Sequence, residues 1–239
     1  MIGFDIGGTK CAVSIGYERD GDLAIVEKRI LPTDLSIAPL EMVDRMCALA
    51  EEMTDDFSRI GISCGGPLDS RRGIILSPPN LPGWDHVAIV EHLKNRYHGA
   101  VSLQNDANAC AIAEWKYGAG RGCENVVFLT FGTGMGAGLI LGGRLYTGSS
   151  DMAGEIGHVR IGEYGPVGYG KCGSFEGFCS GHGIAQIGRA LAMEQLQMGS
   201  RVSYCQSMEE LSGITARSIA ACADAGHADA RAVYERCAE

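Results

Sequence analysis

The 239-residue chain lacks the features of a protein that binds nucleic acid or spans a membrane. No more than two lysine or arginine residues are adjacent, and 29 acidic residues against 20 basic ones give a formal net charge of −9. Binding to a polyanionic nucleic acid needs a basic patch, so we expect no nucleic-acid partner. No apolar run approaches the roughly 20 residues of a membrane-spanning helix, so we also expect no membrane partner.

We also expect neither a secretory leader nor a disulfide framework. Residues 1–5 (Met-Ile-Gly-Phe-Asp) enter a predicted strand directly, without a charged segment followed by a long apolar stretch. Most of the ten cysteines lie within apolar segments, where a free thiol packs as a small hydrophobic side chain. We therefore expect a reduced, cytoplasmic protein.

Glycine, in contrast, is abundant. It supplies 35 of the 239 residues, about double the usual share of about 7%. The glycines gather between apolar segments, near residues 3–8, 61–66, 118–122, 132–143 and 154–183. Because glycine lets the main chain approach a ligand closely, this distribution is typical of loops that bind phosphate or sugar through the backbone.

The apolar pattern predicts an α/β fold, with mixed sheets flanked by helices. Predicted strands lie at residues 2–6, 11–16, 23–31, 59–63, 101–103, 126–131 and 137–141, with short extended segments at 73–76 and 145–146. Predicted helices lie at residues 39–53, 87–97, 107–117, 175–196, 216–225 and 228–237. The segment 117–122 reads as a linker, so we expect an N-terminal lobe of residues 1–117 and a C-terminal lobe of residues 118–239.

Two glycine-rich turns are candidates for binding phosphates. The first, Asp5-Ile6-Gly7-Gly8-Thr9-Lys10, lies between two strands, and its amides, the Thr9 hydroxyl and the Asp5 carboxylate suit a phosphate with Mg²⁺. The second, Gly132-Thr133-Gly134-Met135-Gly136, also joins two strands. Neither opens a helix, which argues against a Walker A loop and a dinucleotide fingerprint. For each turn, an ordinary hairpin without a ligand stays open as the alternative.

Asn105 and Asp106 follow a strand and open a helix. Ligands of α/β sheets gather at the carboxyl ends of strands, so Asp106 is a candidate for accepting the proton of a hydroxyl that attacks phosphorus. Asn105 is a candidate for holding neighbouring hydroxyls. The alternative is that Asp106 caps the helix.

Three further positions suit the recognition of a polyol. Glu155 and His158 lie in the run Gly-Glu-Ile-Gly-His, and Glu176 follows at a distance. Together with Asn80, in the run Pro-Asn-Leu-Pro-Gly-Trp, they offer acceptors and donors that engage vicinal hydroxyls. Any one of them alone is equally consistent with an ordinary surface side chain.

In this order the motifs resemble the ROK family, a family of repressors and sugar kinases within the hexokinase and actin-like ATPase superfamily. Seven segments carry the resemblance: residues 5–10, 65–69, 79–84, 105–109, 132–136, 154–158 and 176–181. The resemblance implies the two-lobed actin-like ATPase (ribonuclease H-like) fold. It also implies a kinase that uses ATP and Mg²⁺ to phosphorylate a hexose or an N-acyl hexosamine, as a glucokinase does.

The resemblance assigns roles to particular residues. Asp106 is expected to be the general base, and the expected sugar-binding residues are Asn80, Asn105, Asp106, Glu155, His158 and Glu176. The expected ATP-binding residues are Asp5, Gly7, Gly8, Thr9, Lys10, Gly132, Thr133, Gly134 and Gly136. A small-molecule sugar is the expected partner, and a homodimer is an open expectation because such kinases are often dimers.

The chain departs from the family pattern in two ways. The three cysteines that hold a structural zinc in many members are replaced by Val167, Tyr169 and Ser174, so we expect no zinc and instead hydrophobic packing by Val167, Tyr169 and Phe175. The chain also ends at Glu239, before the C-terminal segment that family kinases usually carry. The alternative function is therefore a truncated sugar-binding or regulatory protein without kinase activity.

Overall fold

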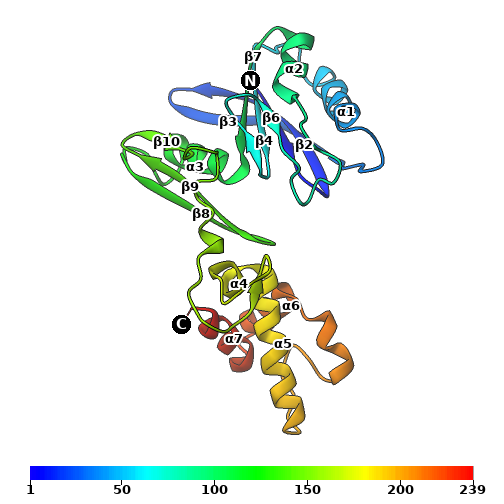
Figure 1. Cartoon of the computed structure of the whole chain (residues 1–239), viewed down its shortest axis with the longest axis vertical. Coiled ribbons are helices and arrows are strands. Elements are labelled where there is room, and N and C mark those ends of the chain that lie inside the picture. The colour runs from blue at the N-terminus through cyan, green and yellow to red at the C-terminus, as the bar shows by residue number, and fades with distance from the viewer. Residues whose placement is uncertain (239) are drawn as a thin grey trace. The chain divides into compact units, whose positions relative to one another are not determined.

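The computed structural model describes residues 1–238 and shows a mixed α/β protein (Figure 1). Packing divides the chain into two compact units. The first comprises Met1–Phe128 and Gly138–Gly154, and the second comprises Leu129–Ala137 together with the chain from Glu155 onward. The predicted lobe boundary between residues 117 and 118 stays a prediction. In this division the chain passes between the units three times, after Phe128, Ala137 and Gly154.

A five-stranded sheet forms the centre of the first unit, with the strand order β3-β2-β1-β4-β7. β1 pairs antiparallel with β2 and parallel with β4, and β4 pairs parallel with β7. The strands are β1 (Ile2–Ile6), β2 (Lys10–Arg19), β3 (Asp22–Pro32), β4 (Arg59–Cys64) and β7 (Ala100–Asn105). All five were predicted: the bounds of β1 agree, and those of the other four strands differ by at most three residues at either end. The three parallel strands therefore end at the same edge of the sheet.

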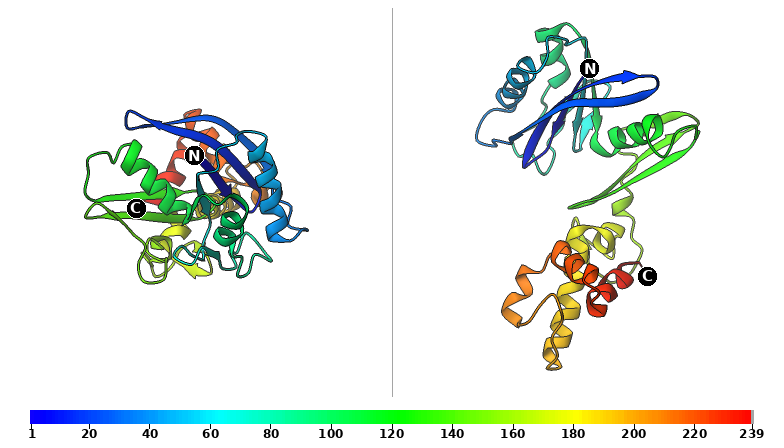
Figure 2. Two further views of the ribbon diagram at one scale, coloured as in Figure 1. Left: turned by 90° about the horizontal axis from the view of Figure 1, so that it is seen from above. Right: turned by 180° about the vertical axis from the view of Figure 1, so that it is seen from behind.

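Helices α1 (Pro39–Glu51) and α2 (Ile89–Tyr97) cover one face of this sheet (Figures 1 and 2). The buried face of α1, which includes Val43 and Met46, packs in one core with Phe4. Strand residues alternate between faces, so Gly3 and Asp5 point to the other side. Helix α3 (Asp106–Tyr117) contributes no side chain to this core. A short hairpin of β5 (Leu68–Asp69) and β6 (Ile74–Ile75) follows β4, and its first strand was not predicted.

A second sheet has the order β10-β9-β8. Its strands are β8 (Val126–Phe131), β9 (Met135–Leu141) and β10 (Arg144–Tyr146). Gly138 lets β9 approach α3, because a Cβ there would lie 2.4 Å from the carbonyl oxygen of Ala107 and 2.6 Å from the Cβ of Ala111. No larger residue fits between the strand and the helix at this position.

The segment that follows β10 is fixed within the first unit by Asp151. Its Oδ2 accepts a hydrogen bond of 2.7 Å from the backbone amide of Ser70. Burial alone would raise the pKa of Asp151, but bonds from Ser70 and Thr147, with the charge of Arg71, lower it overall. The carboxylate is therefore held in its charged form at neutral pH.

The second unit is mostly helical. After the 3-10 turn η1 (Ile156–His158) and the hairpin of β11 (Val167–Gly168) and β12 (Lys171–Cys172), it contains α4 (Phe175–Cys179), α5 (Gly181–Gln197), η2 (Met208–Gly213), α6 (Ala216–Asp224) and α7 (Ala228–Ala238). Its core includes Ile187, Ile214, Ile219 and Val233.

The prediction that residues 175–196 are mostly helical is confirmed, with one interruption at Ser180 between α4 and α5. This residue has extended backbone angles (φ −78°, ψ 162°), and its hydroxyl accepts a bond from the amide of Gly183. Serine favours this capping role over a place in the helix interior. The segment therefore forms two helices, α4 and α5.

Within residues 1–238, no helix is long and apolar enough to cross a membrane. All ten cysteines are free thiols, and four of them are buried: Cys11, Cys47, Cys64 and Cys205.

Candidate functional site

The first glycine turn is held by a residue that the sequence analysis missed. Gly7 donates its amide to the carbonyl of Lys10 at 3.2 Å, which closes the turn between β1 and β2. Thr33, just after β3, donates its hydroxyl to the carbonyl of Gly7 at 2.5 Å and its amide to the carbonyl of Thr9 at 3.1 Å. The β2–β3 register, which pairs Lys10 with Pro32, places Thr33 beside the turn.

Asn80 lies against this turn. A Cβ on Gly8 would lie only 2.1 Å from the carbonyl oxygen of Asn80, so the two backbones are as close as glycine allows. The loop around Asn80 is anchored by the buried side chains of Leu81 and Trp84, whereas Asn80 itself is exposed. Its side-chain amide faces Gly65, at 3.6–3.7 Å from the position of a Cβ there.

Asn105 and Asp106 begin α3 at the same edge of the sheet. The strand register pairs Ile6 with Cys64 and Cys64 with Asn105, so β1, β4 and β7 end side by side. Asn105, and not Asp106, is the N-cap: its Oδ1 accepts from the amides of Ala107 at 3.0 Å and Asn108 at 3.4 Å. The capping alternative for Asp106 is thus corrected, because Asp106 is already the first helical residue.

The charges at this edge affect a neighbouring thiol. Burial raises the pKa of Cys64 to about 12, and the negative charges of Asp106 and Asp5 add to this shift. Cys64 therefore stays a neutral, buried thiol and is no candidate nucleophile. Asp106 is exposed, and its Oδ1 accepts a hydrogen bond of 2.8 Å from the amide of Ala107.

In the second unit, the second glycine turn is bonded to Glu176. The amide of Met135 donates to Oε2 of Glu176 at 2.9 Å. The turn is closed by a bond of 2.9 Å from the amide of Gly132 to the carbonyl of Gly134, and the carbonyl of Gly132 accepts from the amide of Gly181 at the start of α5, also at 2.9 Å. Hydrogen bonds therefore connect this turn to Glu176 of α4 and to Gly181 at the start of α5.

Glu155 immediately precedes the turn η1 and His158 is its last residue, and η1 packs against the second glycine turn. Nε2 of His158 lies 3.5 Å from Oε2 of Glu155. A Cβ on Gly157 would lie 2.7 Å from the carbonyl oxygen of Met135 and 3.2 Å from the Cβ of Glu176. The structure therefore brings Glu155, His158 and Glu176 together around the second glycine turn.

The expected hydrophobic packing in place of zinc is wrong for two of its three residues. Val167 is 46% exposed and Tyr169 is 69% exposed. The short β11–β12 hairpin is held by polar contacts instead: the side chain of Gln186 bonds the amide and carbonyl of Val167, at 3.0 and 2.7 Å. The ring of Tyr169 meets that of His158 edge-on at 5.2 Å.

Two polar contacts complete this segment. Nζ of Lys171 donates to the carbonyl of His158 at 2.7 Å. Ser174 is buried and caps α4 by accepting from the amide of Gly177 at 3.1 Å. Among residues 1–238, no group of three or more histidine, cysteine or acidic side chains is arranged to hold a metal ion.

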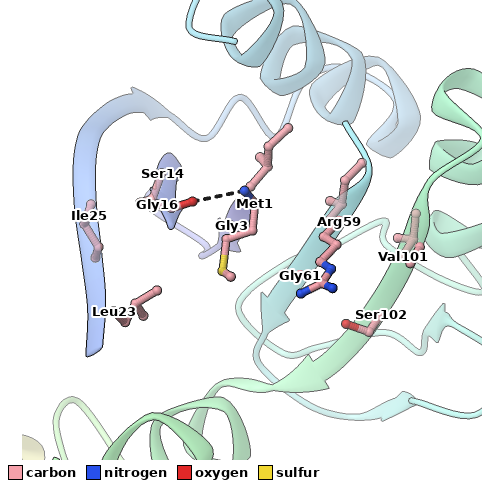
Figure 3. A pocket seen from close by; sticks show the side chains of 13 residues that line it. Met1, Gly3, Ser14, Gly16, Leu23, Ile25, Arg59, Gly61, Val101 and Ser102 are labelled. Carbon is pink, nitrogen blue, oxygen red and sulfur yellow. Dashed lines mark hydrogen bonds between the residues drawn. The ribbon is translucent and has the colours of Figure 1, made fainter. Parts of the chain in front are cut away.

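A cavity of about 470 Å³ lies on the sheet of the first unit (Figure 3). Glycine and serine residues of the face opposite α1 and α2 line it, among them Gly3, Ser14, Gly61 and Ser102, with Leu23 and Ile25 at one side. None of the predicted site residues belongs to its lining. The cavity is therefore a different feature from the candidate site.

The predicted residues thus form two groups, one in each unit. The first unit holds Asp5, Gly7, Gly8, Thr9, Lys10, Asn80, Asn105 and Asp106. The second unit holds Gly132, Thr133, Gly134, Gly136, Glu155, His158 and Glu176. Each group pairs a glycine turn with side chains that suit a polyol.

Known proteins have sequences similar to this chain. A glucokinase of Thermotoga maritima is 35% identical over 169 residues, which cover 70% of this chain and 52% of that protein. An N-acetylmannosamine kinase of Shigella flexneri is 36% identical over 186 residues, which cover 77% of this chain and 62% of that protein. The chain spans little more than half the length of these relatives.

Solved structures show the same fold. A ROK hexokinase from Thermus thermophilus has a TM-score of 0.75 and 28% identity, and the match covers all of this chain and 73% of that one. A ROK glucokinase from Streptomyces griseus, in complex with glucose and AMPPNP, has a TM-score of 0.75 and 29% identity over all of this chain and 75% of that one. The predicted actin-like ATPase fold is confirmed.

The ROK family profile matches residues 1–239. With seven motifs in order, a shared fold and relatives above 30% identity, the chain belongs to the ROK family.

Proposed function

We propose that this protein transfers the γ-phosphoryl group of ATP to a hydroxyl of a hexose or an N-acyl hexosamine. The observation that carries the proposal is the meeting of Asp106, Asn80 and the first glycine turn, each at or against the edge where β1, β4 and β7 end. A general base, a polyol-binding amide and a phosphate-binding turn at one edge are the parts that phosphoryl transfer to a sugar requires.

In this proposal Asp106 is the general base. Its carboxylate accepts the proton of the sugar hydroxyl as that oxygen forms its bond to the γ-phosphorus and the bond from phosphorus to the β-phosphate oxygen of ATP breaks. The side chain is exposed, and its backbone is fixed as the first residue of α3 by the Asn105 cap. A fixed base next to a bound hydroxyl reduces the entropic part of the barrier.

The glycine turns would hold the phosphates of ATP, and Asp5 would hold Mg²⁺. The first turn offers the exposed Thr9 hydroxyl and glycine backbone that carries no side chain, which suits the close approach of an anion. Asp5 exposes its carboxylate on the neighbouring strand, and Mg²⁺ prefers such oxygen ligands. When bound, Mg²⁺ neutralises charge on the phosphates.

Asn80, Asn105, Glu155, His158 and Glu176 would bind the sugar. Asparagine supplies both a donor and an acceptor, and carboxylates accept from two hydroxyls at once, so this set suits a polyol with several vicinal hydroxyls. The relatives are glucokinases and an N-acetylmannosamine kinase, which makes glucose and N-acetylmannosamine the first substrates to test. A homodimer stays a prediction, to be measured by light scattering.

The test is ADP release over a panel of hexoses and N-acetylhexosamines, with Asp106→Asn beside the wild type. We expect Asp106→Asn to lower kcat by at least about 100-fold, the usual contribution of a general base, while calorimetry still detects sugar binding. Asp20→Asn, in the exposed β2–β3 turn, is the matched control and should retain full turnover.

Two results would change the proposal. Turnover retained in Asp106→Asn would remove Asp106 as the base. Sugar binding by the wild type without any ADP release would favour the alternative of a sugar-binding or regulatory protein.

A further inference from the structure

We propose that Glu176 has a second task beyond sugar binding: its carboxylate braces the second glycine turn, so that one side chain serves both the sugar and the nucleotide. This inference rests on the proposed function, in which Gly132, Thr133, Gly134 and Gly136 hold phosphates. It concerns contacts within the second unit only.

The bracing contact is direct. Oε2 of Glu176 accepts a hydrogen bond of 2.9 Å from the amide of Met135, where the turn enters β9. Gly134 leaves the space for it, since a Cβ there would lie 2.7 Å from the same oxygen. Met135 is only 7% exposed, so little water competes for this amide. A bond to a charged acceptor in such a place is stronger than one between neutral groups.

The turn is otherwise held through backbone contacts. The amide of Gly181 donates to the carbonyl of Gly132, and Gly157 packs against the carbonyl of Met135. Glu176 adds a side-chain bond at the point where the turn enters β9. Because α4, which carries Glu176, is capped by the buried Ser174, the brace starts from a fixed point.

One carboxylate can perform both tasks. It has two oxygens with about four lone-pair positions, and the Met135 amide uses one of them. The other oxygen, Oε1, stays available for a sugar hydroxyl. The Met135 amide is engaged by Glu176, which leaves the amides of the neighbouring residues as the donors for phosphate.

This arrangement links the two ligands. A sugar that orders the Glu176 carboxylate also orders the turn, and by reciprocity a nucleotide that orders the turn strengthens sugar binding. A residue that only bound sugar would leave nucleotide affinity unchanged when no sugar is present. Nucleotide affinity without sugar is therefore the decisive measurement.

The experiment measures the Kd of AMPPNP with Mg²⁺ by calorimetry, without sugar, for the wild type, Glu176→Ala and Glu176→Gln. We expect Glu176→Ala to weaken AMPPNP binding on the order of tenfold, the effect of losing one bond to a charged acceptor. Glu176→Gln should stay within about twofold of the wild type, because its Oε1 still accepts from the Met135 amide. Unchanged AMPPNP affinity in Glu176→Ala would overturn the inference.

Glu155→Ala is the matched control. Glu155 is also one of the proposed sugar-binding residues, but its carboxylate lies beside His158 and makes no bond to the turn. It should weaken sugar binding and leave the Kd of AMPPNP unchanged. An equal loss of AMPPNP affinity in Glu155→Ala would show a general effect of removing charge and would also overturn the inference.

Hydrogen exchange gives a readout that needs no ligand. The amide of Met135 should exchange faster in Glu176→Ala and at the wild-type rate in Glu176→Gln and Glu155→Ala, with equal thermal stability as the check on folding. If the wild type binds no AMPPNP, the proposed function fails. The exchange rates then decide by themselves whether Glu176 braces the turn, and unchanged exchange in Glu176→Ala would refute it.

Discussion

At the scale of single residues, the first glycine turn depends on the absence of one methyl group. A Cβ on Gly8 would lie 2.1 Å from the carbonyl oxygen of Asn80, which belongs to the backbone and cannot rotate away. Gly8→Ala should therefore separate the turn from the Asn80 loop, at a cost of about 1–3 kcal/mol in the free energy of unfolding. We expect kcat/KM for both ATP and sugar to fall, measured by ADP release.

Gly3→Ala is the control for this prediction. Gly3 lies in the adjacent strand β1, and the nearest atoms to an added Cβ are 3.9 Å away. The variant should keep both stability and turnover. If Gly8→Ala behaved like Gly3→Ala, the close approach of the two backbones would not matter for the site.

The sequence was enough to select candidate site residues by their chemistry, but not to identify the residues that hydrogen-bond to them. Gly7, Asn80 and Asp106 could be selected from their motifs, because glycine, amide and carboxylate groups at strand ends imply ligand chemistry. Thr33 and Gln186 were missed, since each acts by bonding a backbone group that a single sequence does not place beside it. The same limit explains the wrong expectation for Val167 and Tyr169, whose exposure depends on how a two-residue strand pair turns.

At the scale of elements, Asn105 has two separable roles: it caps helix α3 and it is proposed to bind the sugar. Its Oδ1 caps the helix, whereas its amide nitrogen has no part in the cap. Asn105→Ser keeps a capping oxygen and loses the amide, so it should retain stability and raise the KM for sugar. Asn105→Ala loses both, and we expect it to lower the free energy of unfolding by about 1 kcal/mol as well. Urea unfolding and sugar kinetics measure the two effects.

Thr215→Ala serves as the control for the capping effect. Thr215 caps α6 through the amide of Ser218, and it belongs to no proposed ligand group. It should cost a similar free energy of unfolding and leave the KM for sugar unchanged. A sugar KM that stayed at the wild-type value in Asn105→Ser would show that the amide does not contact the sugar.

Most helices and strands were predictable because their apolar spacing is regular. The features that the apolar pattern does not show are small: β5 has only two residues, and Ser180 interrupts the predicted helical segment 175–196 for a single residue. In these places a local hydrogen bond decides the backbone conformation, and the pattern of apolar residues does not record it.

At the scale of the whole molecule, the two units have separate hydrophobic cores. The first core contains Phe4, Trp84 and many residues of the central sheet, and the second is much smaller and built on α5, α6 and α7. The two clusters share no residue. Since stability rises with the apolar area buried, the first unit should be the more stable one.

The buried cysteines allow the stabilities of the two units to be compared. Cys11, Cys47 and Cys64 lie in the first core, and Cys205 lies in the second. Burial raises the pKa of each thiol in the first core, which keeps these thiols protonated as well as inaccessible while the core is folded. Pulsed alkylation across a urea series, read by mass spectrometry, should therefore label Cys205 at a lower urea concentration than the other three.

The comparison within the first core is the internal control, because Cys11, Cys47 and Cys64 belong to one cluster and should become reactive together. Labelling of all four thiols at one urea concentration would mean that the two units unfold cooperatively, in spite of their separate cores. Labelling of Cys205 at a higher urea concentration than the other three would mean that the second unit is the more stable one, although the first unit has the larger core. In that case the polar contacts of the second unit, such as those of Gln186 and Lys171, would contribute more to its stability than its small core does.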